Sequence, residues 1–342
     1  MQTRLTAMRA AARARVRLQS AIRGYFAAEG FDEVETPCMV PAPGMEPHIR
    51  AFEAPFVPET PEGRERTLYL HTSPEYAMKR LLALGFERIF QLCKVFRNGE
   101  IAPHHNPEFT MLELYRAGAD YGALMRDLEA LLVRAAQAVT GKDHLKAEGR
   151  RVPLMRPFER LTVRDAFLSR TGLDLQNLKD EASLRSAAEA KGHRFSPGAT
   201  EFDDVFFQLF LTKVEPTLGM ERPTFLIEYP ASMASLARLK PGDPEVAERV
   251  ELYVGGVELA NGFSELTDAD EQRRRLIEEQ GLRRRLGKPV YPLDEAFLQA
   301  VGKMPPSAGI ALGLDRLLML CLGARRIEEV LLFPASGFFD DR

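Results

Sequence analysis

Hydrophobic and polar residues alternate in two neighbouring stretches of the chain, residues 90–97 and 106–115. Between them, residues 98–105 include a glycine, a proline and two histidines, so the pattern predicts two antiparallel strands joined by a long polar loop. The apolar face of this hairpin belongs in a core and carries Phe90, Leu92, Phe96, Leu112 and Leu114. The other face carries Gln91, Arg97, Phe109, Glu113 and Tyr115. These side chains suit the floor of a ligand site, although an ordinary amphipathic hairpin shows the same alternation.

Before this hairpin, apolar residues at helical spacing predict a helix over residues 1–28 that ends at Gly30. Its apolar positions include Val16, Leu18, Ile22, Tyr25 and Phe26. A strand is expected at 31–37, irregular or edge structure at 41–66, and a short strand at 67–71. The next helix should begin with Ser73 as N-cap and Pro74 as first helical residue, and end at Gly85.

After the hairpin, helical spacing predicts a helix from about residue 124 to Gly141, followed by a polar connector at 142–160. Thr162 with Asp165, and Thr200 with Asp203, resemble capping boxes and predict helix starts. We therefore expect a helical insertion over about residues 142–222. A later helix, 268–286, carries three arginines at 273–275 and three at 283–285, for which a solvated face is expected.

Residues 249–254 and 257–260 flank Gly255-Gly256, which is typical of a two-residue hairpin turn. Counting outward from the turn pairs Tyr253 with Glu258 and places Glu251 diagonally from Glu258 on the same face. Such a pair could hold Mg²⁺ together with phosphate oxygens, or could be a solvent-facing acidic pair. In the strand at 307–313, small residues (Gly309, Ala311, Gly313) alternate with bulky ones, so a ligand can approach one face closely.

Composition adds limits rather than a function. The chain has 342 residues, 45% hydrophobic and 28% charged, which is ordinary for a globular protein. Its net charge of −3 gives the whole molecule no electrostatic attraction for nucleic acid, although residues 1–28 contain arginines and no acidic residue. No apolar run approaches a membrane span. Three scattered cysteines (Cys38, Cys93, Cys321) favour a reducing compartment and argue against a structural zinc site.

Four segments together resemble the class II aminoacyl-tRNA synthetases of the lysyl type. Residues 95–98 with 105–115 are similar to motif 2, the first helix with 31–37 to motif 1, and 307–316 to motif 3; residues 258–266 are similar to the lysyl-type signature. The resemblance implies an α+β catalytic domain, an antiparallel sheet flanked by helices, spanning residues 1–342 as a single domain. It also implies ATP and Mg²⁺ as cofactors and, through motif 1, a homodimer.

The resemblance also implies residue roles. Catalysis would rest on Arg97, Glu258 and Arg316, and the metal would lie on Glu251 and Glu258. The ATP site would comprise Arg97, Asn98, Gly99, Glu100, His105, Asn106, Phe109, Glu258, Leu259, Gly313 and Arg316. The amino acid would be bound by Ser73, Pro74, Glu75, Glu113, Tyr115, Asn261, Phe263, Glu265 and Ala311, with Glu75 and Glu113 on the amino group near its carboxylate and Tyr115 and Glu265 on the distal ammonium.

Three departures from lysyl-tRNA synthetases narrow the family. Only one helix fits before motif 1, where those enzymes carry an OB-fold that binds the anticodon; Gly99 interrupts the usual Arg-Asn-Glu of motif 2; and Ala311 replaces a glycine. In these respects the chain resembles the elongation factor P lysine ligase family, which implies (R)-β-lysine as substrate, elongation factor P as acceptor, no stable tRNA binding, no membrane association and a cytoplasmic location. The alternatives are a minimal lysyl-tRNA synthetase acting on α-lysine and a non-catalytic paralogue.

Overall fold

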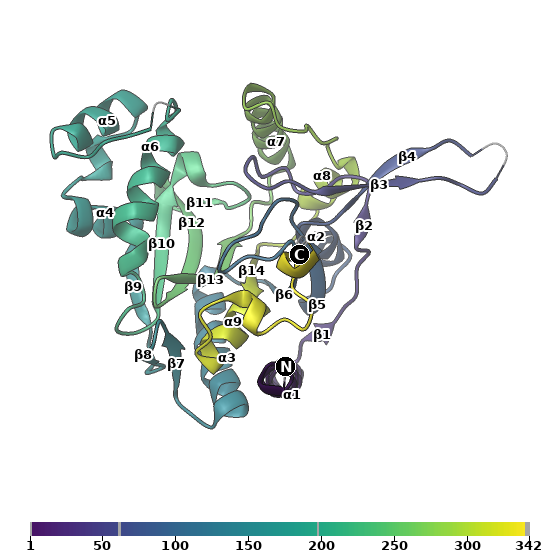
Figure 1. Ribbon diagram of the computed structural model, residues 1–342. Coiled ribbons are helices and arrows are strands. Elements are labelled where there is room, and N and C mark those ends of the chain that lie inside the picture. Colours follow the sequence, from purple (N-terminus) through teal and green to yellow (C-terminus); the bar gives the residue numbers. More distant parts are fainter. Residues whose placement is uncertain (1, 61–62, 197, 339–342) are drawn as a thin grey trace.

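A mixed sheet lies at the centre of the computed structural model, which describes residues 2–60, 63–196 and 198–338 (Figure 1). Within these residues the strands follow the order β1-β5-β6-β14-β13-β12-β10-β9, with β11 paired to β12. All pairs are antiparallel except β1–β5 and β9–β10. The strands are β1 (Asp32–Glu33), β5 (Arg88–Phe96), β6 (Glu108–Ala117), β9 (Glu159–Thr162), β10 (Thr224–Pro230), β11 (Leu239–Lys240), β12 (Asp243–Val254), β13 (Val257–Ser264) and β14 (Ser307–Gly313).

One face of the sheet is covered by α1 (Gln2–Ala28), α3 (Tyr121–Thr140) and α9 (Leu314–Leu322), and the main core lies between them. The predicted hairpin is confirmed: Phe90 pairs with Leu114, and Phe26 of α1 stacks on Phe90 at 4.5 Å between ring centroids. Two expected core residues differ. Val16 is 63% exposed, and Phe96 is half-buried near the end of β5, its ring centroid 6.5 Å from that of His71.

The opposite side carries α2 (Glu75–Ala83), α7 (Ala269–Arg285) and α8 (Glu295–Val301). A small sheet of β2 (Met39–Val40), β4 (Arg66–Leu70) and β3 (Phe52–Phe56) extends away from this body in Figure 1. Tyr76 of α2 stacks on Phe297 of α8 at 3.9 Å, which joins the two helices. The strand expected at 31–37 is only β1, because only Asp32 and Glu33 pair with β5.

The segment 142–222 is only partly helical. Its first part forms the hairpin β7 (His144–Ala147) and β8 (Arg150–Pro153) and then β9, so the expected polar connector was wrong. Leu145 and Val152 alternate with polar neighbours and are buried in the main core, which explains the hairpin. The helices are α4 (Val163–Thr171), α5 (Glu181–Glu189) and α6 (Phe202–Leu209), with short helical turns at Leu175–Asn177, Phe210–Val214 and Glu215–Thr217. They bury their own apolar cluster.

Helix boundaries follow local capping. The Thr162 hydroxyl accepts a 3.0 Å hydrogen bond from the Asp165 N–H, as predicted, whereas the second expected start lies one residue later, with Glu201 as N-cap and Asp204 in the box. Further short turns occupy Ala231–Met233, Ile327–Glu329 and Ala335–Phe338.

No helix in the described ranges has both the length and the apolar character needed to cross a bilayer.

Candidate active site

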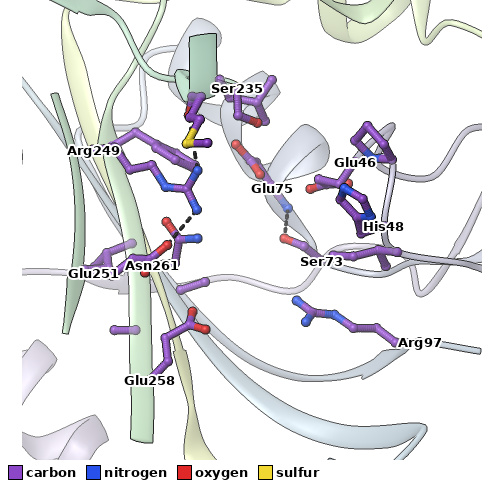
Figure 2. Close-up of a pocket in the computed structure, with 18 of the residues that line it drawn as sticks. Glu46, His48, Ser73, Glu75, Arg97, Ser235, Arg249, Glu251, Glu258 and Asn261 are labelled. Atoms are coloured by element: carbon purple, nitrogen blue, oxygen red, sulfur yellow. Dashed lines mark hydrogen bonds and ion pairs between the residues drawn. The ribbon is translucent and has the colours of Figure 1, made fainter. Parts of the chain in front are cut away.

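A cavity of about 840 Å³ opens on the face of the sheet opposite the main core (Figure 2). Its walls come from the start of α2, from the loop between β5 and β6, from β6, β12, β13 and β14, and from α7. It brings together most of the residues predicted from the sequence: Ser73, Glu75, Arg97, Glu100, His105, Asn106, Phe109, Glu113, Tyr115, Glu251, Glu258, Leu259, Asn261, Phe263, Ala311, Gly313 and Arg316.

Four predicted site residues do not line this cavity. Pro74 lies on a smaller neighbouring cavity and is itself the N-cap of α2, so the expected cap at Ser73 was wrong by one residue. Asn98 and Gly99 lie in the turn after β5, where the Asn98 N–H donates to Arg50 O at 2.7 Å and Gly99 is exposed with φ +88°. Glu265 is only 2% exposed and is held from behind by Lys79.

The floor of the cavity is built by strand register. Glu113 of β6, Ala311 of β14 and Asn261 of β13 are direct neighbours across three strands. Alternation puts Gly309, Ala311 and Gly313 toward the cavity, while Ile310, Leu312 and Leu314 enter the core, as predicted. β14 therefore has almost no side-chain atoms on the cavity side, and a ligand can lie against its backbone.

The two carboxylates Glu251 and Glu258 share one wall. The sequence predicted the pair Tyr253–Glu258 correctly, but a register shift beyond it places Glu251 opposite Asn261. Glu251 accepts hydrogen bonds of 2.6 Å from both the Arg249 guanidinium and the Tyr253 hydroxyl. Burial and then the charge of Glu251 raise the pKa of Glu258.

These carboxylates fit Mg²⁺ only together with a nucleotide. In the described part of the chain, no group of three or more acidic, histidine or cysteine side chains could hold a metal. Two carboxylates are the usual protein share of a Mg²⁺ site that phosphate oxygens complete. Glu258 has room for this role, because its nearest cation is Arg316 Nη1, 3.9 Å away.

Two arginines lie near Glu258. Arg97 and Glu258 point toward one another across the cavity in Figure 2. The Arg97 guanidinium carbon lies 5.2 Å from the centre of the Phe109 ring, and its ion pair with Glu100 is long, at 3.8 Å. Arg316 is fixed instead, donating 2.8 Å hydrogen bonds to Glu258 O and to His105 Nε2. Burial and then Arg316 lower the pKa of His105 to about 4, so this imidazole is neutral and accepts.

The other end of the cavity is acidic. Glu113 accepts hydrogen bonds from Ser73 (2.7 Å) and Tyr115 (2.5 Å). Burial, followed by the charge of Glu75, raises the pKa of Glu113 to about 7, and burial raises that of Glu265 to about 8. Glu265 Oε1 and Asn261 Oδ1 are buried and accept no hydrogen bond from the described residues. Unfilled acceptors of this kind are expected where a ligand supplies the missing donors.

The comparisons with known proteins decide the family. The family model described as tRNA synthetases class II (D, K and N) matches residues 1–337. The chain belongs to the class II tRNA synthetase family. Among curated relatives, a protein of Salmonella typhi is 44% identical over 94% of each chain, and proteins of Salmonella paratyphi B and Salmonella schwarzengrund are 43% identical over the same shares. All three bear the name elongation factor P–(R)-β-lysine ligase.

The membership confirms the resemblance to class II synthetases and the α+β fold class. Two cations beside the predicted carboxylates, Lys79 and Arg249, were not predicted from the sequence. Lys79 follows Glu75 at the i,i+4 spacing of a helical ion pair, and Arg249 precedes Glu251 by two positions on one strand face. From these spacings, Lys79 could have been predicted as the partner of Glu75, and Arg249 as the partner of Glu251.

The solvated face expected for the arginines of α7 holds for Arg284 and Arg285, which are exposed, but was wrong for Arg283. Arg283, expected on a solvated face, is fully buried and donates to Glu46 O (2.6 Å), Ile49 O (3.0 Å) and Pro289 O (2.5 Å). These hydrogen bonds hold the 46–49 turn at the cavity rim. Arg283 can be buried because the backbone carbonyls accept the hydrogen bonds that water would otherwise accept.

Proposed function

We propose that this protein activates (R)-β-lysine with ATP as the aminoacyl adenylate and transfers it to a lysine side chain of elongation factor P. The observation that carries the proposal is the identity of 43–44% over 94% of relatives that bear this name. The cavity supports it, because a cationic region and an acidic region lie at one continuous site.

The cationic region suits the triphosphate. Arg97 is bound only loosely by its neighbours and would hold the α-phosphate, while Arg316, fixed by Glu258 O and His105, would lie against adenine. Phe109 would take the other side of the base, and Leu259, Asn106 and Gly313 would complete the nucleotide site. The Asn106 amide is already used, since it accepts from the Ala335 N–H and donates to Glu108 O, so it would act by shaping the wall.

Mg²⁺ would lie on Glu251 and Glu258 and supply neutralisation of phosphate charge. The side chains define the remaining chemistry. The substrate carboxylate attacks the α-phosphorus, pyrophosphate leaves, and Arg97 offsets the negative charge that accumulates on the phosphate oxygens. In the second step the acceptor amine attacks the carbonyl carbon, AMP leaves, and the amine loses a proton.

The acidic region suits a diamino acid. Glu75 and Glu113 would bind the amino group nearer the carboxylate, and Glu265 Oε1, which accepts no hydrogen bond from the described chain, would receive the distal ammonium beside Tyr115. Asn261 and Phe263 would contact the chain between them, and Ala311 would lie beneath. A buried ammonium is stable only with such partners.

The test has two stages. ATP–pyrophosphate exchange is measured with (R)-β-lysine and with α-lysine, and the protein is then incubated with ATP, β-lysine and elongation factor P, whose intact mass is recorded. We expect exchange that favours β-lysine and a mass increase of one β-lysyl group. Exchange with neither isomer would contradict the proposal, and exchange without any mass increase would leave only the activation step.

The proposal extends to the assembly and its setting. We propose a homodimer formed through the motif 1 region, a cytoplasmic location and no stable complex with tRNA. The homodimer is tested by sedimentation of the purified protein at assay concentration. A sedimenting species with the mass of a single chain would contradict it.

A further inference from the structure

Lys79 is a buried cation behind the acidic end of the cavity, and the proposed mechanism gives it no role. Its side chain is 1% exposed and is not among the residues that line the cavity. Its Nζ contacts Glu75 Oε1, one helical turn earlier, and lies 2.6 Å from Glu265 Oε2. A single ammonium group therefore fixes both carboxylates from the side away from the cavity.

The charges at this end do not balance. Glu75, Glu113 and Glu265 are each at most 8% exposed, and Lys79 is the cation that forms an ion pair with any of them among the described residues. The hydroxyls of Ser73 and Tyr115 stabilise Glu113 but carry no charge. When all four groups are ionised, two negative charges remain uncompensated in a buried region, which is unfavourable without a ligand.

We propose that Lys79 is a built-in counter-ion that leaves the pocket short of two positive charges and so selects amino acids with two ammonium groups. This inference rests on the proposed function. A substrate with two ammonium groups completes the charge balance, whereas one with a single ammonium leaves a buried carboxylate unpaired or protonated. Lys79 touches no substrate and acts through Glu75 and Glu265, so it is a positioning residue.

Removal of Lys79 should be detectable through the pKa values of the carboxyl groups around it. Lys79 lowers the pKa of both Glu113 and Glu265, so both would titrate at higher pH without it. Burial raises the pKa of Tyr115 and of Cys93, which face Glu113 from β6 and β5, and both stay neutral.

Two further carboxyls, Glu46 of the 46–49 turn and Glu279 of α7, face Glu75, and burial raises the pKa of each, that of Glu279 to about 8. Because Glu279 titrates in the same pH range, a midpoint measured in one protein could come from Glu279. The effect of Lys79 is therefore the difference between the pH midpoints of the variant and the parent.

The experiment measures kcat/KM for β-lysine against pH by ATP–pyrophosphate exchange in the parent and in Lys79→Met. We expect kcat/KM for β-lysine to fall at least about tenfold near neutrality, its midpoint to move about one pH unit upward, and the KM for ATP to change little. Lys303→Met, on an exposed lysine, is the matched control and should keep the parent profile.

Chemical rescue separates charge from packing. Lys79→Ala should regain activity with added propylammonium and not with 1-propanol, because only the former replaces the missing charge. An unchanged pH midpoint in Lys79→Met, or equal rescue by 1-propanol, would overturn the inference while exchange by the parent upheld the proposed function. A parent without exchange on any lysine isomer would instead contradict the proposed function itself.

Discussion

Gly309 and Tyr115 face each other on the paired strands β14 and β6 so closely that a Cβ atom at position 309 would lie 2.1 Å from Tyr115 Cε1. Real Cβ atoms do not approach so closely, so only glycine at position 309 leaves room for the tyrosine ring in this place. The Tyr115 hydroxyl in turn donates to Glu113 at 2.5 Å. The backbone at 309 therefore positions a carboxylate at the acidic end of the cavity.

Gly309→Ala should displace Tyr115 and weaken amino acid binding more than ATP binding. Overpacking of this kind typically costs about 1–3 kcal/mol, so we expect the KM for β-lysine to rise at least about tenfold. Gly24→Ala on α1, where the nearest heavy atom to the new Cβ lies 3.6 Å away, is the control and should leave both KM values unchanged. A parent-like KM for β-lysine in Gly309→Ala would show that Tyr115 is not held in this way.

Arg97→Ala should abolish adenylate formation without unfolding the protein. Its long contact with Glu100 and its position over Phe109 contribute little to stability, whereas loss of one preorganised charge on the phosphate typically costs about 10²–10³ in rate. Pyrophosphate exchange and the melting temperature, measured on one preparation, test this. Glu258→Ala should behave similarly, and exchange within about threefold of the parent would remove either residue from the catalytic set.

Much of this site could be predicted because strand alternation and turn residues are local properties of the chain. The bare face of Gly309, Ala311 and Gly313 and the pair Tyr253–Glu258 follow from parity and from the turn at Gly255-Gly256. The register shift between Leu252 and Tyr253 was not predictable, because the extra residue on β13, Leu259, carries no sequence signal of a bulge.

Tertiary contacts account for the other differences. The segment expected as a connector forms the hairpin at 144–153, whose apolar signal is weak because only Leu145, Ala147 and Val152 of these residues enter the main core. Arg283 was expected in solvent, since nothing local shows that carbonyls of residues 46 and 49 lie beside it. The sequence around Lys79 is that of an ordinary helical lysine. Its burial depends on Glu265, which is far away in the sequence and lies beside it only in the folded chain.

Ala311→Gly should shift the choice between lysine isomers. Ala311 lies in register with Glu113 on one side and Asn261 on the other, so its methyl group lies between the carboxylate proposed to bind the nearer amino group and the amide proposed to contact the middle of the substrate. β-Lysine carries its amino group one carbon farther from the carboxylate, and the methyl should crowd the α-isomer. We expect kcat/KM for α-lysine to improve relative to β-lysine by about 10–200-fold, and an unchanged ratio would contradict this role.

Binding of β-lysine should strengthen as pH rises through the range in which the buried carboxyls ionise. The pKa values of Glu113 and Glu265, about 7 and about 8, lie above those of an unfolded chain, so the empty folded state binds extra protons and loses stability as pH rises through this range. A diammonium ligand binds the ionised form. The increase in melting temperature caused by β-lysine should therefore grow from about pH 6 to about pH 9. A constant increase would show that these carboxyls do not titrate on binding.

The acceptor should be a protein and not tRNA, and the arginines of α1 give the structural reason. Arg15 forms an ion pair with Asp315, Arg17 donates to Val139 O at 3.0 Å, and Arg23 pairs with Glu33. These arginines hold α1 to its own chain, which leaves less charge for phosphate contacts, and the protein carries a net charge of −3. A tRNA ligand needs many such contacts and loses affinity steeply with salt as counterions are released.

We therefore expect negligible acid-precipitable charging of tRNA by a preparation that adds β-lysine to elongation factor P. Filter binding of tRNA across a salt series supplies the second measurement, and its slope should be shallow because few phosphates are neutralised. Arg15→Met and Arg23→Met should leave that slope unchanged if both side chains serve the fold. Efficient tRNA charging without a mass increase on elongation factor P would instead establish a minimal synthetase, since the same adenylate would then react with a ribose hydroxyl and not with a lysine amine.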